Sequence, residues 1–337
     1  MIDYVAKQLA RAQTKNPWSF IIGFILLVLL TIPGIFLLVG NVEASLENVL
    51  PSSVESVATM NDARTQYSAD MLHIVLYATD VVVDVREAQA YAYEIASRLE
   101  GTPRIVSVQA SFDDSRINHD YTLAVIDVQA DTGTSTEKIS EAIQTLQEAI
   151  DASERSNPGV TTAITGFAAI DQATFQTIMS DFLVITGVAM SLILLVVFSL
   201  FRSVRFTLIP MASVMVALIA TMGVTGYLNI TITVVTMVAA AMILGLGIDF
   251  GIHTIHSYKE YRKTRRAKSA MKRTVHELFR AQLGASLTTS AGFLALTLGV
   301  LPAMANLGII LAIGILFTFF ASTMLLPPIL LLTEKSQ

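Results

Sequence analysis

The sequence has little of what a soluble protein of its length needs. Charged residues make up 15% of the 337 residues and hydrophobic residues 53%, whereas soluble globular chains are about a quarter charged. Cysteine is absent, which excludes disulfides and thiolate metal sites and leaves the redox compartment open. The mean hydropathy is +0.61. The composition therefore predicts a polytopic α-helical membrane protein rather than two or three soluble domains.

Long apolar stretches recur along the chain, at about the 20 residues that cross a bilayer core as a helix. The predicted spans are 18–38, 182–201, 206–227 and about 233–258, 284–301 and 307–332. The first stretch is longer than the about 7–15 apolar residues of a signal peptide, so a retained anchor is favoured over a cleaved leader. The expected organisation is an N-terminal tail (1–17), a first transmembrane helix (18–40), a large insert (41–181), five further helices (182–332) with a basic loop at 259–280, and a C-terminal tail (333–337).

Charge predicts the orientation of these segments. The insert 41–181 carries 22 acidic and 7 basic residues, whereas the rest of the chain carries 5 acidic and 15 basic ones. Six spans with both termini in the cytoplasm place all 15 of these basic residues on the cytoplasmic side, as the positive-inside rule requires. The insert is then extracytoplasmic. Its acidity makes nucleic-acid binding improbable.

The insert has the patterns of a folded α+β domain. Apolar and polar residues alternate as in strands, and two amphipathic helices lie between them, which gives the order β-α-β-β-α-β. The predicted strands are 73–79, 105–110, 121–129 and 161–166. This order is the split βαβ pattern of ferredoxin-like domains, and one more helix is expected at about 54–67. The insert has no metal cluster, nucleophile–base pair or Gly-rich phosphate loop, so neither catalysis nor a bound metal is expected.

An acidic residue interrupts the fourth predicted span, in the stretch MILGLGIDFGIHTIHSY (242–258). Asp249 lies 10 residues before Lys259, which at about 1.5 Å per residue is roughly half of a core about 30 Å thick. A charge at that depth costs on the order of 2.5–3.5 kcal/mol, and desolvation favours the neutral carboxyl. Such a residue is expected to face the interior of the helix bundle. An acid that changes its charge there is suited to couple proton passage to a conformational change.

Two histidines follow Asp249 on the predicted helix. His253 lies at i+4 on the same face, and His256 three residues further on, so the three side chains would form a stripe towards the basic segment. This spacing suits a proton path. Each residue also has a structural alternative: Asp249 as a hydrogen-bonding link between helices, His253 as a packing residue, and His256 as an interfacial one.

Small and hydroxyl-bearing residues accompany the acid. Glycines allow helices to approach one another closely, so three of them are predicted to be packing positions: Gly245, Gly247 and Gly251. In the fifth predicted span, Thr288 and Thr289 provide hydroxyls at a depth that could meet Asp249.

The whole pattern resembles half of a transporter of the resistance-nodulation-division (RND) superfamily. One span, a βαββαβ-type outer domain and five further spans, the fourth with GLGIDFGIH (245–253), are similar to its hydrophobe/amphiphile efflux branch, which includes MmpL, hopanoid-exporter and Patched-like proteins. The other similar stretches are YKEYR (258–262), LTTSAGFLAL (287–296) and LENVLP (46–51). The resemblance covers nearly the whole chain.

The resemblance implies a proton-driven exporter of lipids or other hydrophobic molecules in the inner (cytoplasmic) membrane. Carried over to this chain, the proton relay falls on Asp249, with His253, Thr288 and Thr289 in supporting positions. The insert would be a porter domain that gathers substrate. No enzymatic activity and no cofactor are expected, because the proton gradient supplies the energy.

The chain departs from this family in size, because family members usually fuse two such halves into twelve spans. A homodimer is the simplest arrangement that rebuilds them, with the two copies of Asp249 facing one another; a heteromer with a second half is the alternative. Two other functions remain open. One is a lipid sensor or scaffold resembling sterol-sensing domains, and the other is a protein-secretion auxiliary like the SecD/SecF pair.

Overall fold

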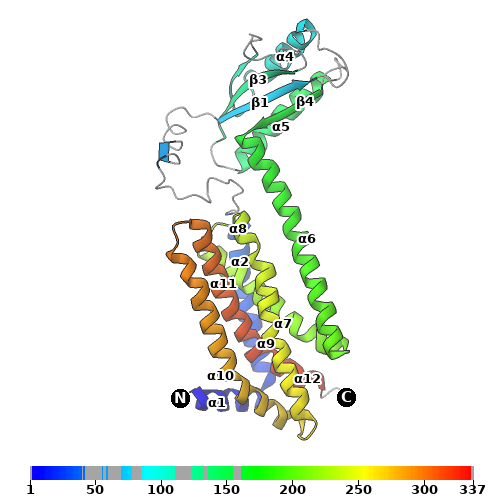
Figure 1. Cartoon of the computed structure of the whole chain (residues 1–337), viewed down its shortest axis with the longest axis vertical. Coiled ribbons are helices and arrows are strands. Elements are labelled where there is room, and N and C mark those ends of the chain that lie inside the picture. Colours follow the sequence, from blue (N-terminus) through cyan, green and yellow to red (C-terminus); the bar gives the residue numbers. More distant parts are fainter. Residues whose placement is uncertain are drawn as a thin grey trace. The chain divides into compact units, whose positions relative to one another are not determined.

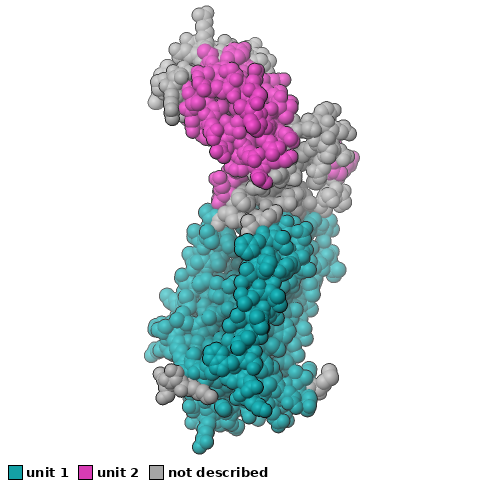
Figure 2. Space-filling view, turned by 180° about the vertical axis from the view of Figure 1, so that it is seen from behind, with its two compact units in different colours: residues 1–43, 179–337 teal, residues 44–178 magenta. Residues whose placement is uncertain are grey.

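The structure, a computed structural model, describes residues 2–39, 41, 55, 58–59, 70–77, 85–110, 123–132, 136–154 and 161–334. The chain divides into two compact units, one of Met1–Glu43 with Met179–Gln337 and the other of Ala44–Ile178 (Figure 2). The predicted helix near 54–67 falls outside the described residues apart from three positions, and LENVLP (46–51) lies wholly outside them.

The second unit contains a four-stranded sheet with two helices. Its elements are β1 (Asp70–Tyr77), α4 (Val85–Leu99), β2 (Ile105–Gln109), β3 (Leu123–Ala130), α5 (Thr136–Glu154) and β4 (Thr161–Gly166). The described strands lie in the order β2-β3-β1-β4, and each neighbouring pair is antiparallel. This is the element order that the sequence predicts, and the strand order is that of a split βαβ unit.

The core of this unit lies on one face of the sheet, because side chains alternate between the faces of a strand. Leu72, Ile74 and Leu76 of β1 are fully buried, as are Ile126 and Val128 of β3. Both helices contribute to the same core, with Tyr91, Ile95 and Leu99 of α4 and Leu146 and Ile150 of α5. The two amphipathic helices thus cover the apolar face that the strand alternation indicates.

The chain leaves this sheet through a glycine. Gly166 ends β4 with φ +121°, a conformation that L side chains rarely adopt. A Cβ there would lie 2.7 Å from the carbonyl oxygen of Met71. The helix that follows at once, α6 (Phe167–Phe201), continues for 35 residues.

The first unit is a bundle of apolar helices (Figure 1). Besides the C-terminal part of α6, its helices are α1 (Ile2–Lys15), α2 (Pro17–Val39), α7 (Val204–Tyr227), α8 (Val234–Met237), α9 (Ala239–Arg262), α10 (Ala267–Leu294), the 3-10 helix η2 (Ala295–Leu298), α11 (Pro302–Phe320), the π-helix η3 (Ala321–Leu325) and α12 (Leu326–Glu334). Helices α7, α9, α10 and α11 pack against one another, and α2 packs along α7. A buried apolar cluster from α7, α9 and α11 lies between them, with Ile243, Leu244 and Ile310 fully buried.

Five helical segments of the described chain are long and apolar enough to cross a membrane. They are Pro17–Leu38, Ser180–Phe201, Val204–Tyr227, Val234–Arg262 and Pro302–Glu334. They correspond to five of the six predicted spans. The remaining prediction, 284–301, falls on α10 and η2: the N-terminal half of α10 is strongly charged, and the α-helix gives way to a 3-10 turn at Ala295.

The basic segment 259–280 is mostly helical, so the predicted loop there is wrong. Helix α9 continues to Arg262 and α10 starts at Ala267, so only a four-residue connection, 263–266, separates them. The physical reason is composition, because Lys, Arg, Ala and Met are strong helix formers. The charges therefore lie on two helix ends that extend beyond the apolar parts of their helices.

Helices α2 and α7 approach so closely that their backbones touch. Gly34 of α2 lies against Gly223 of α7, and a Cβ added to either glycine would overlap a backbone carbonyl of the other helix. The hydroxyl of Tyr227 donates a hydrogen bond to the carbonyl of Leu30 (2.9 Å) across the same crossing. Small residues at the contact are what allow two helices to pack in a membrane without a hydrophobic driving force.

The π-helix η3 comes directly before two prolines, Pro327 and Pro328. A proline has no N–H to donate, so Pro327 leaves the carbonyl of Thr323, four residues earlier, without its helical partner. The side-chain amide of Gln13, which is fully buried, donates a hydrogen bond to that carbonyl (2.6 Å). Helix α1 is thereby joined to the broken end of the last span.

Gln13→Leu is expected to lower the stability of the bundle, because it leaves the Thr323 carbonyl buried without a donor. An unpaired buried polar group costs about 1–3 kcal/mol, so the melting temperature of the purified protein should fall by about 2–6 °C. The matched control is Gln8→Leu on the same helix, since Gln8 is exposed and its amide donates to the exposed hydroxyl of Tyr4 (3.1 Å). Equal melting temperatures for the two variants would show that the Gln13 bond is dispensable.

Candidate functional site

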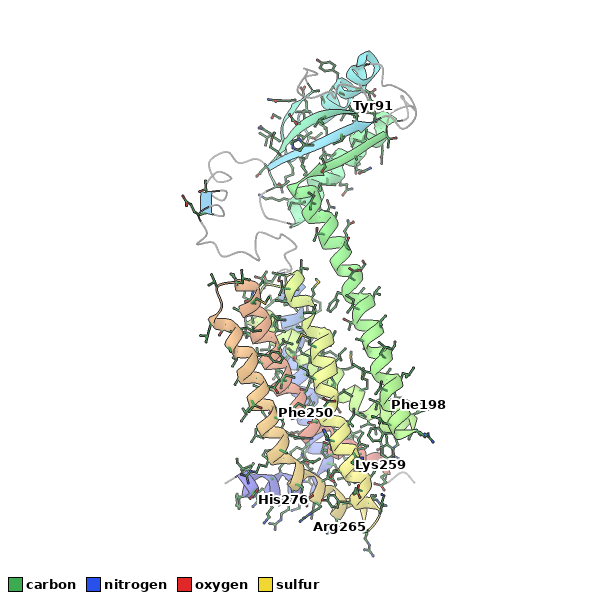
Figure 3. The ribbon with its side chains drawn as sticks, in the orientation of Figure 1. Tyr91, Phe198, Phe250, Lys259, Arg265 and His276 are labelled. Atoms are coloured by element: carbon green, nitrogen blue, oxygen red, sulfur yellow. The ribbon has the colours of Figure 1, made fainter. Side chains whose placement is uncertain are left out.

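Helix α9, which carries the acidic residue of interest, is fixed in the bundle by one closely packed face. Gly247 and Gly251 lie on it: a Cβ at Gly247 would overlap the Thr318 side chain of α11, and one at Gly251 would lie 2.7 Å from Cβ of Pro210 on α7. Phe250, labelled in Figure 3, makes an edge-to-face contact with Phe319 at 6.5 Å between ring centroids. These two glycines therefore bring α7 and α11 close to α9.

A buried amide joins α9 to α10. Gln282 of α10 is 5% exposed, and its Nε2 donates to the carbonyl of Phe250 (3.0 Å) and contacts the Thr254 hydroxyl oxygen at 3.1 Å. Thr254 in turn donates to the same carbonyl at 2.8 Å. Gln282 is not among the residues that the sequence patterns predicted, although an amide two residues before an expected span was the available signal. This network fixes the rotation of α9 about its axis relative to α10.

Asp249 lies on the opposite, exposed face of α9. It is 15 residues after Val234 and 13 before Arg262, close to the middle of the candidate span Val234–Arg262. The expectation that it faces the bundle interior is not met within one chain, because the buried stripe of α9 is filled by small, apolar and Thr side chains. Among the described residues, no hydrogen bond or ion pair to Asp249 is present. Its carboxyl thus lies at mid-span without a hydrogen-bond or ion-pair partner from the described part of its own chain.

The exposed stripe of α9 also carries the predicted histidines. Gly245, Asp249 and His253 are all exposed and follow one another at four-residue spacing. His256 lies nearer the helix end, where its Nε2 is 3.8 Å from Oε2 of Glu260 and both side chains are mostly exposed. This position is the one expected of an interfacial residue. His253 is the histidine one turn from Asp249.

The predicted hydroxyls of α10 have no hydrogen bond to Asp249 among the described residues. Thr288 is exposed, and its hydroxyl donates to carbonyls of its own helix, those of Gly284 and Ala285, at 3.0 Å each. Thr289 is half-buried. The next residue, Ser290, is buried and donates to the carbonyl of Ala312 on α11 (3.1 Å). Of the three hydroxyls, only that of Ser290 joins α10 to a neighbouring helix.

The exposed faces of α9 and α10 have open space beside their glycines. A Cβ added to Gly245 on α9, or to Gly284 or Gly292 on α10, would meet no atom within 4 Å. Gly245 thus differs from Gly247 and Gly251, because no other helix that the structure describes packs on it. The exposed face that carries Asp249 therefore has space for added side chains at these three glycines.

The site does not have the composition of a metal centre. In the part of the chain that the structure describes, no three His, Asp or Glu side chains gather closely enough to hold an ion. The chemistry available on this face of α9 is that of one carboxyl group with an imidazole one turn away. Such a pair can take up and release protons.

Comparison with known proteins agrees with this architecture. The profile of the MMPL family matches residues 45–336. MJ1562 of Methanocaldococcus jannaschii, named as a membrane protein, is 27% identical over an alignment that covers 99% of this chain and 95% of the relative. Transport protein MmpL4 of Mycobacterium leprae is 26% identical over 55% of this chain. The matched part is only 20% of MmpL4, whereas MJ1562 is of similar length to this chain.

Proposed function

The chain belongs to the MMPL family, and from this premise we propose that it is a secondary transporter that exports lipids or other hydrophobic or amphipathic molecules at the expense of a proton gradient. The observation that carries the proposal is the position of Asp249, on an exposed face near the middle of an apolar span. A charged side chain at the bilayer centre costs on the order of 2.5–3.5 kcal/mol, so acids there are rare and mark ion or proton pathways.

In this proposal Asp249 alternates between its neutral and charged forms. The neutral form tolerates an apolar environment, whereas the charged form requires water or hydrogen-bond donors. A conformational change that admits water to one end of the path at a time therefore couples proton transfer to movement of the helices. His253 lies one turn towards the basic end of α9 and relays the proton there. Thr288 and Thr289 of α10 complete the path by turning their hydroxyls towards it.

The transporter is a homodimer in this proposal. Asp249 is exposed in one chain, and the glycines around it leave room for close approach by another helix. A second copy that covers this face removes the carboxyl from lipid and brings the two copies of Asp249 near a shared two-fold axis. Two such chains together have twelve spans, and the alignment with MJ1562 covers 95% of that relative.

The membrane topology proposed has six spans, with α10 and η2 as the fifth. Its polar first half holds the Gln282 bridge to α9, and its second half contacts α11, where the Phe293 carbonyl lies against Gly308. Both termini and the α9–α10 connection are cytoplasmic, and the α+β unit is a porter domain outside the inner membrane. The support is the charge distribution, which leaves 15 basic residues on one side.

Proton flux in proteoliposomes tests the function. Vesicles with an internal pH-sensitive dye and an imposed potential are compared for the unmodified chain and Asp249→Asn, which keeps the size and hydrogen-bonding reach but cannot titrate. Loss of a positioned acid–base group slows proton transfer by about 100-fold or more, and that is the expected reduction in flux. The matched control is Glu260→Gln at the exposed end of the same helix, which should leave the flux unchanged.

Two results would contradict the proposal. Flux that persists in folded Asp249→Asn would move the relay to another group. Absence of flux from the unmodified chain in every lipid composition would remove the basis for a pump, and the same helices would then be better described as a lipid sensor or scaffold.

A further inference from the structure

A basic cavity of about 330 Å³ lies between α1 and the N-terminal part of α10. Five Lys and Arg side chains and one histidine line it: Lys7, Arg11, Arg265, Lys272, Arg273 and His276. No carboxylate is among the described residues that line it. A cavity with this lining has the charge of an anion-binding site.

Most of this positive charge has no ion-pair partner among the residues that the structure describes. Arg273 forms an ion pair with Glu277, and the guanidinium of Arg265 lies 5.9 Å from the ring centroid of Tyr261. In the part of the chain that the structure describes, no ion pair holds Lys7, Arg11 or Lys272. Three like charges around one cavity repel each other, so an anion between them stabilises the arrangement.

The histidine of the cavity has an unused polar atom. Nε2 of His276 is buried and has no hydrogen-bond partner in the described part of the chain. Buried polar groups are almost always paired with protein, water or a bound ligand. Figure 3 shows His276 on α10 where that helix passes α1, and Arg265 nearer the α9–α10 connection. An anion with several oxygens would accept hydrogen bonds from the lysines and arginines, and also from this imidazole once its ring turns towards the cavity.

The position of the cavity along the bundle indicates the kind of anion. Helix α1 packs on α10 through Ala6 and Ala10 and ends two residues before the span that begins at Pro17. On the other side, α10 starts five residues after the end of the span at Arg262. The cavity therefore lies at the level where apolar helices leave the bilayer, which is the level of lipid headgroups.

We propose that this cavity binds the phosphate headgroup of an anionic membrane lipid, held by Lys7 and Arg11 of α1 and by Lys272 and His276 of α10. The headgroup phosphate fits the charge, and its acyl chains continue along the apolar surface beside α1 and α10. Basic pockets beside spanning helices at the membrane surface bind lipids of this class. The site is distinct from the exposed face of α9, and its occupancy does not depend on transport.

The test is lipid retention by the full-length protein in nanodiscs of phosphatidylcholine with a varied fraction of phosphatidylglycerol. Native mass spectrometry after mild delipidation counts the anionic lipids that remain bound. The triple variant Lys7→Gln, Arg11→Gln, Lys272→Gln should retain phosphatidylglycerol at least about 10-fold more weakly, because each cation near an anionic headgroup contributes roughly 1 kcal/mol.

The control variant removes the same charge outside the cavity, with Lys263→Gln, Arg266→Gln and Arg280→Gln, all at exposed positions. It should retain the lipid as the unmodified chain does. Equal losses in the two triple variants would overturn the site and leave only a diffuse surface attraction. A second control uses discs of pure phosphatidylcholine with inorganic phosphate at millimolar concentration. If the protein binds inorganic phosphate as strongly as it binds phosphatidylglycerol, the ligand is a free anion and the assignment to a lipid headgroup is overturned. Arg11→Gln alone repeats the comparison if the triple variant does not fold.

Discussion

Gly245→Leu is expected to convert a dimer into monomers and to abolish proton flux. Gly245 lies one turn before Asp249 on the exposed face of α9, and a Cβ there meets no atom of its own chain within 4 Å. Within one chain the substitution is therefore harmless. Facing lipid it would even be favourable, by about 0.3–0.6 kcal/mol. Only a partner that packs closely on this face makes the added side chain costly, since overpacking costs about 1–3 kcal/mol for each copy.

The measurement is the molar mass of the solubilised protein by light scattering over a dilution series, followed by flux in proteoliposomes. A symmetric interface contains the substitution twice, so the cost of overpacking counts twice. The dissociation constant of the dimer should therefore rise by at least about 100-fold. Gly187→Leu is the control, because Gly187 on α6 also has open space around a Cβ. An unchanged dimer that still transports would show that this face of α9 contacts lipid and that the two chains meet elsewhere.

Much of the fold follows from local patterns in the sequence. The length of the apolar stretches predicted the five helical segments that are long and apolar enough to cross a membrane. The alternation of apolar and polar residues predicted which strand residues face the helices of the small sheet, such as Ile74 and Ile126. These patterns are informative because they depend on the period of one element and on one solvent boundary. The segment 259–280 was mistaken for a loop because high charge within a membrane protein indicates a position outside the bilayer, not the absence of a helix.

The candidate site was harder to predict, because the surroundings of Asp249 depend on contacts between helices. The sequence placed Asp249 at mid-span, and the structure adds that it lies opposite the packed stripe of Gly247 and Gly251. Which side of a helix faces the bundle is decided by its neighbours, and an apolar span gives little periodicity because it is hydrophobic all round. The amide of Gln13 illustrates the same limit: its partner, the Thr323 carbonyl, is 310 residues away.

Gly34→Val is expected to cause the largest loss of stability of any single substitution considered for this chain. A Cβ at Gly34 overlaps the backbone carbonyl of Gly223, and a backbone cannot rotate away as a flexible side chain can. Helices α2 and α7 must separate, and they lose the contacts along their whole crossing, including the bond from Tyr227 to the Leu30 carbonyl. The cost should exceed the about 1–3 kcal/mol of ordinary overpacking.

Thermal inactivation of the purified protein measures this loss as a half-life, because unfolded membrane proteins aggregate and do not return. Gly23→Val is the matched control on the same helix, since a Cβ at Gly23 meets no atom within 4 Å. Both variants change the helix propensity equally, so any difference between them reports the crossing with α7. Equal half-lives would mean that α2 separates from α7 without consequence. The first span would then be an anchor that the rest of the bundle does not need. Gly34 would not be required for the crossing of α2 and α7.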